Sequence, residues 1–139
     1  MSQAPLISTT DQAMVEQLAN HLPQSLMIIA EPGLDGAGVA RHLAHHCRSD
    51  VLTVSPLPQK NTISTEQIRD LTAMLRTYSS VRRVVIINPA NLMTESAQNA
   101  LLKTLEEPNP NTHFLLIAET STDLLSTIQS RCQQLTLHR

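Results

Sequence analysis

Apolar runs alternate with amphipathic segments along this chain, and the alternation predicts an α/β domain. Residues 84–87 and 113–118 are mostly apolar without regular polar interruption, which is typical of strands buried on both faces of a parallel sheet. Between them, Thr94 has the position of an N-cap and Pro108 that of a helix stop. The helix between these two residues has an apolar face formed by Ala97, Ala100, Leu101, Thr104 and Leu105. A strand, a helix and a second strand in this order indicate a parallel sheet with connecting helices.

Three further segments complete the predicted sheet. Residues 25–30 form another strand of the buried type, 51–54 a short strand, and 133–137 the last one. We expect one domain over residues 1–139, because a chain of this length can build one hydrophobic core and not two. Residues 1–8 are polar and contain a proline, and we expect them to form a loose lead-in.

Two more helices have start signals in the sequence. Thr9 and Gln12 have the spacing of a capping box, and Pro23 follows the helix that they would begin. Ser64 and Gln67 have the same spacing at the start of a later helix. A short helix is expected before the last strand. The expected apolar residues of these three helices are Met14, Val15, Leu18 and Leu22; Ile63, Ile68, Leu71, Met74, Leu75 and Tyr78, with Ile63 and Ile68 as a hydrophobic staple; and Leu124, Leu125 and Ile128.

The composition argues against direct nucleic-acid binding and against a membrane protein. Ten basic and twelve acidic residues give a formal net charge of −2, so the basic excess that attracts phosphate backbones is missing. Tyr78 and Phe114 are the only aromatic residues, too few to build base-stacking platforms. The sequence has no signal-peptide pattern and no apolar run near the ~20 residues that span a bilayer. We expect a cytoplasmic protein.

No metal site is predicted. Cys47 and Cys132 are far apart and neither belongs to a C-x-x-C pair, so the ligand spacing of a structural zinc site is missing. His42, His45 and His46 lie on one helical segment, and their spacing could place two of them beside a metal ion. No carboxylate or third ligand is spaced to join them, so exposed helical histidines are the favoured interpretation.

All three glycines of the chain lie in one loop between the strand 25–30 and the helix after it, at Gly33, Gly36 and Gly38. Gly33 and Gly38 keep the G-x-x-x-x-G spacing of the Walker A motif, whose backbone N–H groups hold phosphate at a helix N-terminus. The Lys and Ser/Thr that should follow are replaced by Val39 and Ala40. We therefore favour a tight strand-to-helix turn without a ligand over a nucleotide-binding loop.

The order of residues in two segments resembles a known family. Residues 99–108, NALLKTLEEP, and 127–132, TIQSRC, are similar to those of bacterial clamp loaders. More closely, they resemble the ATPase-type domain shared by the gamma/tau and delta-prime subunits of DNA polymerase III, which belong to the AAA+ class. The resemblance covers nearly the whole chain and is strongest from Ile63 to Leu137. It implies a P-loop NTPase-like sheet of five parallel strands with helices on both faces, without the lid and collar domains of full-length subunits.

Several residues depart from the pattern of that family. The acidic pair expected after the strand 84–87 is Asn88 and Pro89, which can neither hold Mg²⁺ as carboxylates nor polarise an attacking water. Ala118 and Glu119 lie where a polar sensor residue would contact phosphate. The family's zinc-binding cysteine cluster has no room, because Cys47 nearly adjoins the strand 51–54. These departures predict a protein that binds no cofactor and hydrolyses no ATP.

Ser130, Arg131 and Cys132 resemble the motif that offers an arginine finger to the nucleotide of a neighbouring subunit. An arginine in a salt bridge at a helix end is the other interpretation, and the sequence leaves both open. The resemblance implies a non-catalytic, delta-prime-like subunit or domain, with gamma/tau and delta subunits as partners and DNA contacted only through the complex. The alternatives are a degenerate AAA+ scaffold outside replication and an active P-loop ATPase, which would need the missing residues.

Overall fold

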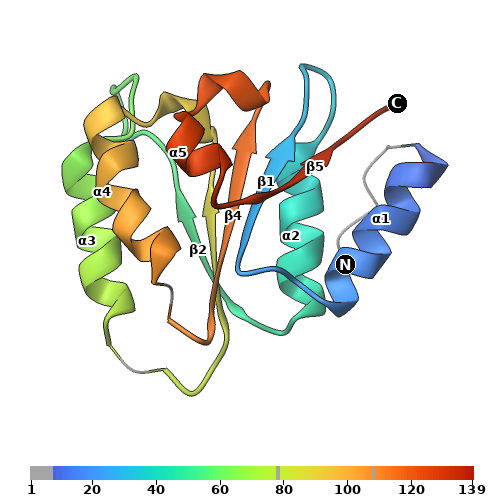
Figure 1. Cartoon of the computed structure of the whole chain (residues 1–139), viewed down its shortest axis with the longest axis horizontal. Helices are drawn as coiled ribbons and strands as arrows, with labels where there is room; N and C mark the ends of the chain where they lie inside the picture. Colours follow the sequence, from blue (N-terminus) through green and yellow to red (C-terminus); the bar gives the residue numbers. More distant parts are fainter. Residues whose placement is uncertain (1–7, 78, 108) are drawn as a thin grey trace.

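A five-stranded parallel sheet in the order β2-β3-β4-β1-β5 forms the centre of the fold, as the computed structural model in Figure 1 shows. The structure describes residues 8–77, 79–107 and 109–139. The strands are β1 (Ser25–Ile29), β2 (Asp50–Val54), β3 (Arg83–Ile87), β4 (Thr112–Ala118) and β5 (Gln133–Thr136). The helices are α1 (Thr9–Asn20), α2 (Gly36–His46), α3 (Thr65–Leu75), α4 (Glu95–Glu106) and α5 (Ser126–Gln129), with 3₁₀ turns η1 (Ala90–Leu92) and η2 (Ser121–Asp123).

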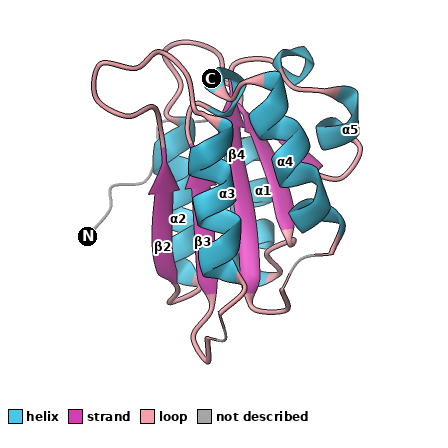
Figure 2. Cartoon of the chain, turned by 90° about the vertical axis from the view of Figure 1, so that its left-hand side faces the viewer, coloured by secondary structure: helices cyan, strands magenta, loops and turns pink. Residues whose placement is uncertain are grey.

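Helices cover both faces of the sheet and close two apolar cores. Figure 2 shows α3 and α4 in front of the sheet and α1 and α2 behind it. Successive residues of β3 alternate between the cores: Val85 and Ile87 pack toward α3 and α4, whereas Val84 and Ile86 pack toward α1 and α2. This alternation explains why the central strands are apolar beyond their first one or two residues. The predicted α/β fold with five parallel strands and helices on both faces is confirmed.

The strand order brings three loops to one place. β3, β4 and β1 are neighbours in the sheet, and because all strands are parallel, the loops that follow them emerge at the same edge. The chain leaves β1 for α2 on one face of the sheet and leaves β3 for α4 on the other (Figure 2). A cleft lies at the carboxyl ends of these strands. Ligands of open α/β sheets bind in such a crevice.

The prediction for α1 is wrong in two details. Its N-cap is Ser8 and not Thr9, since the Ser8 hydroxyl accepts the backbone N–H of Asp11 at 3.2 Å. The predicted lead-in therefore ends before Ser8, and the rest of it lies outside the described residues. Met14 was expected on the apolar face and is 44% exposed, because the buried face runs through Asp11, Val15 and Ala19. Asp11 is buried because its carboxylate accepts hydrogen bonds from His138.

The predicted start of α3 is confirmed. Gln67 donates its backbone N–H to the Ser64 hydroxyl and accepts the Ser64 backbone N–H, each at 3.1 Å, which forms the expected capping box. Ile63 and Ile68 are buried. Met74 is 45% exposed and does not belong to the apolar stripe, contrary to the prediction. Tyr78, also predicted in that stripe, lies outside the described residues.

α4 and α5 lie in the carboxyl-terminal part of the chain, and Arg131 follows α5. α4 begins as predicted, since the Thr94 hydroxyl accepts the Ala97 N–H at 3.0 Å. α5 is shorter than predicted, because Leu124 and Leu125 are extended and precede it. Leu124 and Ile128 nevertheless fill the same core as expected. Within the described residues, no helix combines the length and the apolar character that crossing a bilayer requires.

Candidate functional site

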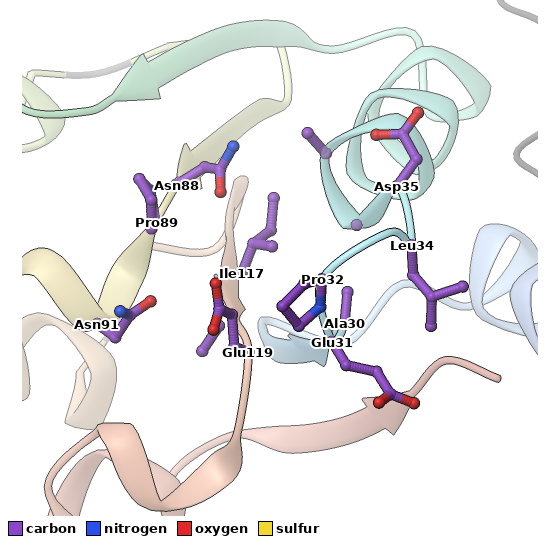
Figure 3. A pocket seen from close by; sticks show the side chains of 13 residues that line it. Ala30, Glu31, Pro32, Leu34, Asp35, Asn88, Pro89, Asn91, Ile117 and Glu119 are labelled. Atoms are coloured by element: carbon purple, nitrogen blue, oxygen red, sulfur yellow. The ribbon is translucent and has the colours of Figure 1, made fainter.

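A cleft of about 210 Å³ lies at the carboxyl ends of β1, β3 and β4. We call it the strand-end cleft. Figure 3 shows Asn88, Pro89 and Asn91 on one side of it and residues of the loop after β1 on the other, with Glu119 between them. Its described lining is Ala30, Glu31, Pro32, Leu34, Asp35, Gly36, Ala37, Asn88, Pro89, Asn91, Ile117, Ala118 and Glu119.

The glycine loop has the backbone of a tight strand-to-helix turn. Gly33 has φ +97°, a conformation that residues with a Cβ rarely adopt. At Gly38 a Cβ would collide with the carboxylate of Asp35. Gly36 begins α2 and lies buried against the sheet. The three glycines identified in the sequence therefore serve this turn, and of them only Gly36 belongs to the described lining of the strand-end cleft.

A carboxylate of the chain itself occupies the N-terminus of α2. Asp35 is the N-cap, and its Oδ1 accepts the backbone N–H of Gly38 at 2.8 Å. In a phosphate-binding loop, N–H groups at this position would face the anion. Here one of them is satisfied internally, and the Asp35 charge would repel a phosphate. Arg41 lies 3.9 Å from the other Asp35 oxygen, but both side chains are exposed and the attraction is weak.

The residues at the Walker A lysine and serine/threonine positions belong to the core. Val39 and Ala40 are both 0% exposed and pack with Leu43 and Ala44 in the core behind the sheet. Neither belongs to the described lining of the strand-end cleft. These positions therefore contribute apolar packing to the fold and present no group to a ligand in the cleft.

The ends of β3 and β4 bring amide and acidic groups to the cleft. Asn88 and Pro89, joined by a cis peptide bond, line it as their sequence position indicated. Among the described residues, the buried Oδ1 of Asn91 has no hydrogen-bond partner. Glu31, Asp35 and Glu119 belong to the described lining of the cleft, which contains no lysine or arginine. This charge distribution disfavours the phosphates of a nucleotide.

Arg131 lies away from this cleft and contacts α4 and α5. Its Nε donates to Oε1 of Glu106 at 3.0 Å, and its Nη2 lies 2.9 Å from the same oxygen. Its Nη1 donates to the Thr127 carbonyl at 3.3 Å and to the Ser130 hydroxyl at 3.0 Å. The salt bridge at a helix end, one of the two interpretations of the sequence, is therefore present. Sequence reasoning missed Glu106, because 25 residues separate it from Arg131 and no local pattern links them.

Cys132, the last residue of the predicted motif, is partly buried against the core in front of the sheet. Burial raises the pKa of its thiol to about 11, so the thiol is protonated at neutral pH. A protonated thiol is a poor nucleophile and a poor metal ligand. Cys132 therefore packs against this core with its thiol protonated.

Gln98 connects α4 to the segment that carries Arg131. It is 6% exposed, and its Nε2 donates to the Met93 carbonyl at 3.3 Å. Its Oε1 accepts the backbone N–H of Leu125 at 2.8 Å. These two bonds fix the entry into α5 relative to the start of α4. The helical pattern did not reveal Gln98, because a glutamine between Ala97 and Asn99 gives no sign of burial.

One histidine of α2 lies beside a carboxylate of α1. Nε2 of His42 lies 3.5 Å from a carboxylate oxygen of Glu16 on α1. Over residues 8–77, 79–107 and 109–139, no group of three or more His, Cys, Asp or Glu side chains is arranged to hold a metal ion.

The strand order, the glycine loop between β1 and α2, and the cleft at the strand ends define the P-loop type of α/β domain that occurs in AAA+ proteins. A DNA polymerase III gamma subunit-related protein from Thermotoga maritima has a similar structure, with a TM-score of 0.77 at 26% identity over 93% of this chain and 46% of that one. The Thermotoga maritima RuvB branch migration motor, at a TM-score of 0.66, shares the fold with 16% identity over 96% of this chain and 45% of its own.

The particular family follows from the sequence. All residues from 1 to 139 match the family described as "DNA polymerase III, delta subunit", and the chain belongs to this family. DNA polymerase III subunit delta' of Haemophilus influenzae is 42% identical over 94% of this chain and 41% of its own length. The Escherichia coli subunit delta' is 37% identical over 63% of this chain and 30% of its own length. The chain thus spans less than half the length of these curated relatives.

Proposed function

We propose that this chain is a delta-prime-like AAA+ domain of the DNA polymerase III clamp loader, and that it contributes to DNA replication without hydrolysing ATP. Its family and its relatives named delta' support the assignment to the clamp loader. The partners are gamma/tau and delta subunits in the cytoplasm. The net charge of −2 gives the chain little affinity of its own for DNA, so DNA is reached through the complex.

The Asp35 carboxylate at the N-terminus of α2 is the observation that carries the non-hydrolysing role. The position that should attract phosphate is negatively charged, and the residues that should bind phosphate and Mg²⁺ are buried as Val39 and Ala40. At the end of β3, Asn88 replaces a carboxylate that would bind Mg²⁺. At the end of β4, Glu119 lies where a polar side chain would contact phosphate.

Calorimetric titration with MgATP tests this role. We expect no heat of binding for this protein, whereas a gamma-type subunit with intact Walker motifs, used as the positive control, should bind. A micromolar dissociation constant for the protein itself would refute the loss of the nucleotide site, on which the non-hydrolysing role rests.

Arg131, with Ser130 and Cys132 beside it, acts in trans on the nucleotide of a neighbouring subunit. A guanidinium keeps its charge at all physiological pH values and can contact two phosphate oxygens at once. Arginine fingers contribute roughly 10³–10⁵-fold in GTPases, and a smaller factor is expected here. Arg131→Ala should lower the DNA- and clamp-stimulated ATPase of the reconstituted complex, and Arg131→Lys should restore it only in part. Equal rates for Arg131→Ala and wild type would refute the finger.

A second candidate function is a degenerate AAA+ scaffold outside replication, in which the ion pair with Glu106 would be the whole role of Arg131. Affinity purification from the native host distinguishes the two. Recovery of gamma/tau or delta subunits supports the clamp loader. Their absence, with other proteins recovered instead, supports the scaffold.

A further inference from the structure

All three nitrogens of the Arg131 guanidinium contact residues of its own chain. A guanidinium has five N–H donors. The Nε–H donates to Oε1 of Glu106, and Nη1 donates to the Thr127 carbonyl and the Ser130 hydroxyl. Nη2 lies 2.9 Å from the same Glu106 oxygen as an ion-pair contact, and no second contact of Nη2 occurs among the described residues. Thr127 and Ser130 belong to α5 and the turn after it, so Glu106 is the contact that ties the guanidinium to a second element.

Glu106 is held on a rigid support. It is the last residue of α4, next to the buried Leu105 and five residues after the buried Leu101. Gln98 fixes α4 to the entry of α5 through the Leu125 N–H. The carboxylate therefore keeps its place relative to the turn that carries Arg131. The side chains of Arg131 and Glu106 remain 37% and 46% exposed, so a group of another molecule can reach the pair.

We propose that Glu106 is a positioning residue for Arg131. It orients the guanidinium before a neighbouring subunit's phosphate arrives and leaves one Nη2 N–H free for a phosphate oxygen. This inference rests on the proposed trans role of Arg131. A free arginine side chain samples many rotamers, and fixing it in advance reduces the entropy that is lost when the phosphate binds. Glu106 itself need not touch the phosphate.

A double-mutant cycle in the reconstituted complex tests this role, with the protein in its full natural length. The variants are Glu106→Ala, Arg131→Ala and both together. Glu106→Ala should lower the stimulated kcat by about two- to tenfold, the lower part of the range that coupled neighbours show, and leave the KM for ATP unchanged. In the Arg131→Ala background the same change should have no further effect, because Glu106 acts through the arginine.

Two conservative variants complete the design. Glu106→Gln keeps an acceptor oxygen for Nε without the charge, so its kcat should lie between those of Glu106→Ala and wild type. Glu107→Gln is the matched control, since Glu107 is the adjacent exposed carboxylate and Arg131 is bound by Glu106 instead. In the protein alone, NMR should show faster hydrogen exchange of the Arg131 Nε–H in Glu106→Gln than in Glu107→Gln.

The outcomes separate this inference from the proposed function. If Arg131→Ala lowers kcat but Glu106→Ala and Glu106→Gln match Glu107→Gln, the finger stands and the positioning role is wrong. If Glu106→Ala lowers kcat equally in both backgrounds, its effect does not pass through Arg131 and the inference is also wrong. If Arg131→Ala matches wild type, the finger itself is wrong and the positioning role falls with it. Should Glu106→Ala fail to fold, Glu106→Gln and the exchange measurement decide.

Discussion

Removing the side-chain amide of Gln98 should destabilise the fold by about 2–4 kcal/mol. Gln98→Ala leaves the Leu125 N–H without its acceptor, and an unpaired buried donor costs about 1–3 kcal/mol. The bond to the Met93 carbonyl is longer, at 3.3 Å, and its loss adds less. The substitution also removes buried side-chain atoms, at about 0.8 kcal/mol for each methylene.

Urea denaturation of the wild type and three variants measures these contributions. Gln98→Leu loses both hydrogen bonds but keeps most of the side-chain volume. It should therefore lower the free energy of unfolding less than Gln98→Ala does, and the difference between the two variants measures the packing contribution. Asn99→Ala, the exposed neighbour on the same helix, is the control and should change stability by about 0.5 kcal/mol or less. Hydrogen exchange of the Leu125 amide should accelerate in both Gln98 variants and not in Asn99→Ala.

Equal urea midpoints for Gln98→Ala and Asn99→Ala would contradict this reasoning. Such a result would mean that the Gln98 amide does not join α4 to the entry of α5, and that Arg131 is held by its own turn and Glu106 alone. A loss of stability without faster exchange at Leu125 would place the effect in packing and not in the hydrogen bond.

Three further predictions concern the core and two titratable groups. Leu101 is 0% exposed in the core with Phe114, so Leu101→Ala should cost about 2–5 kcal/mol in urea denaturation, and an unchanged midpoint would mean that the core is assigned wrongly. Burial lowers the pKa of His113 below its ordinary value of 6.5, and the nearby Arg82 charge lowers it further. A hydrogen bond to the Pro23 carbonyl raises the pKa, but its effect is smaller than that of burial. The unfolded chain then takes up a proton that the folded chain does not, so stability should fall as pH drops below about 6.5, and His113→Gln should flatten the profile there; an identical profile would contradict the assignment. Because burial raises the pKa of Cys132 from 9.0 to about 11, its thiolate fraction at pH 8 should be about 100-fold lower than that of a thiol with the ordinary pKa. Mass spectrometry after alkylation should find it modified far more slowly in the folded protein than in urea, and equal rates would contradict the burial.

The sequence predicted those features whose causes are local. The capping box of Ser64 and Gln67 depends on residues three positions apart, and the N-cap of Thr94 likewise contacts a residue within one turn. The buried strands were predictable because both faces of a central parallel strand need apolar residues, as β4 shows. The core position of Leu101 followed from the spacing of the apolar residues on α4.

Features that depend on distant residues could not be predicted. Asp11 is buried because it binds His138, 127 residues later, and Met14, on another side of α1, is 44% exposed. The partner of Arg131 is 25 residues away, and the bond between Gln98 and Leu125 spans 27. A periodic pattern assigns a residue to a helix face, but only the packing of other elements decides which part of that face is covered.

The residues at the nucleotide-binding positions stabilise the fold more than Arg131 does. Val39 and Ala40 are core residues, and Asp35 caps a helix, so each of them stabilises the structure in a way that a phosphate-binding residue at the same position would not. Arg131 contributes little in this sense, because exposed ion pairs add about 0–1 kcal/mol. Its three hydrogen bonds and its ion pair with Glu106 therefore order a charged group at the surface without much benefit to stability. An ordered guanidinium that the fold hardly needs is the arrangement expected where a charge is offered to another molecule, and this contrast favours the proposed trans role over a purely structural salt bridge.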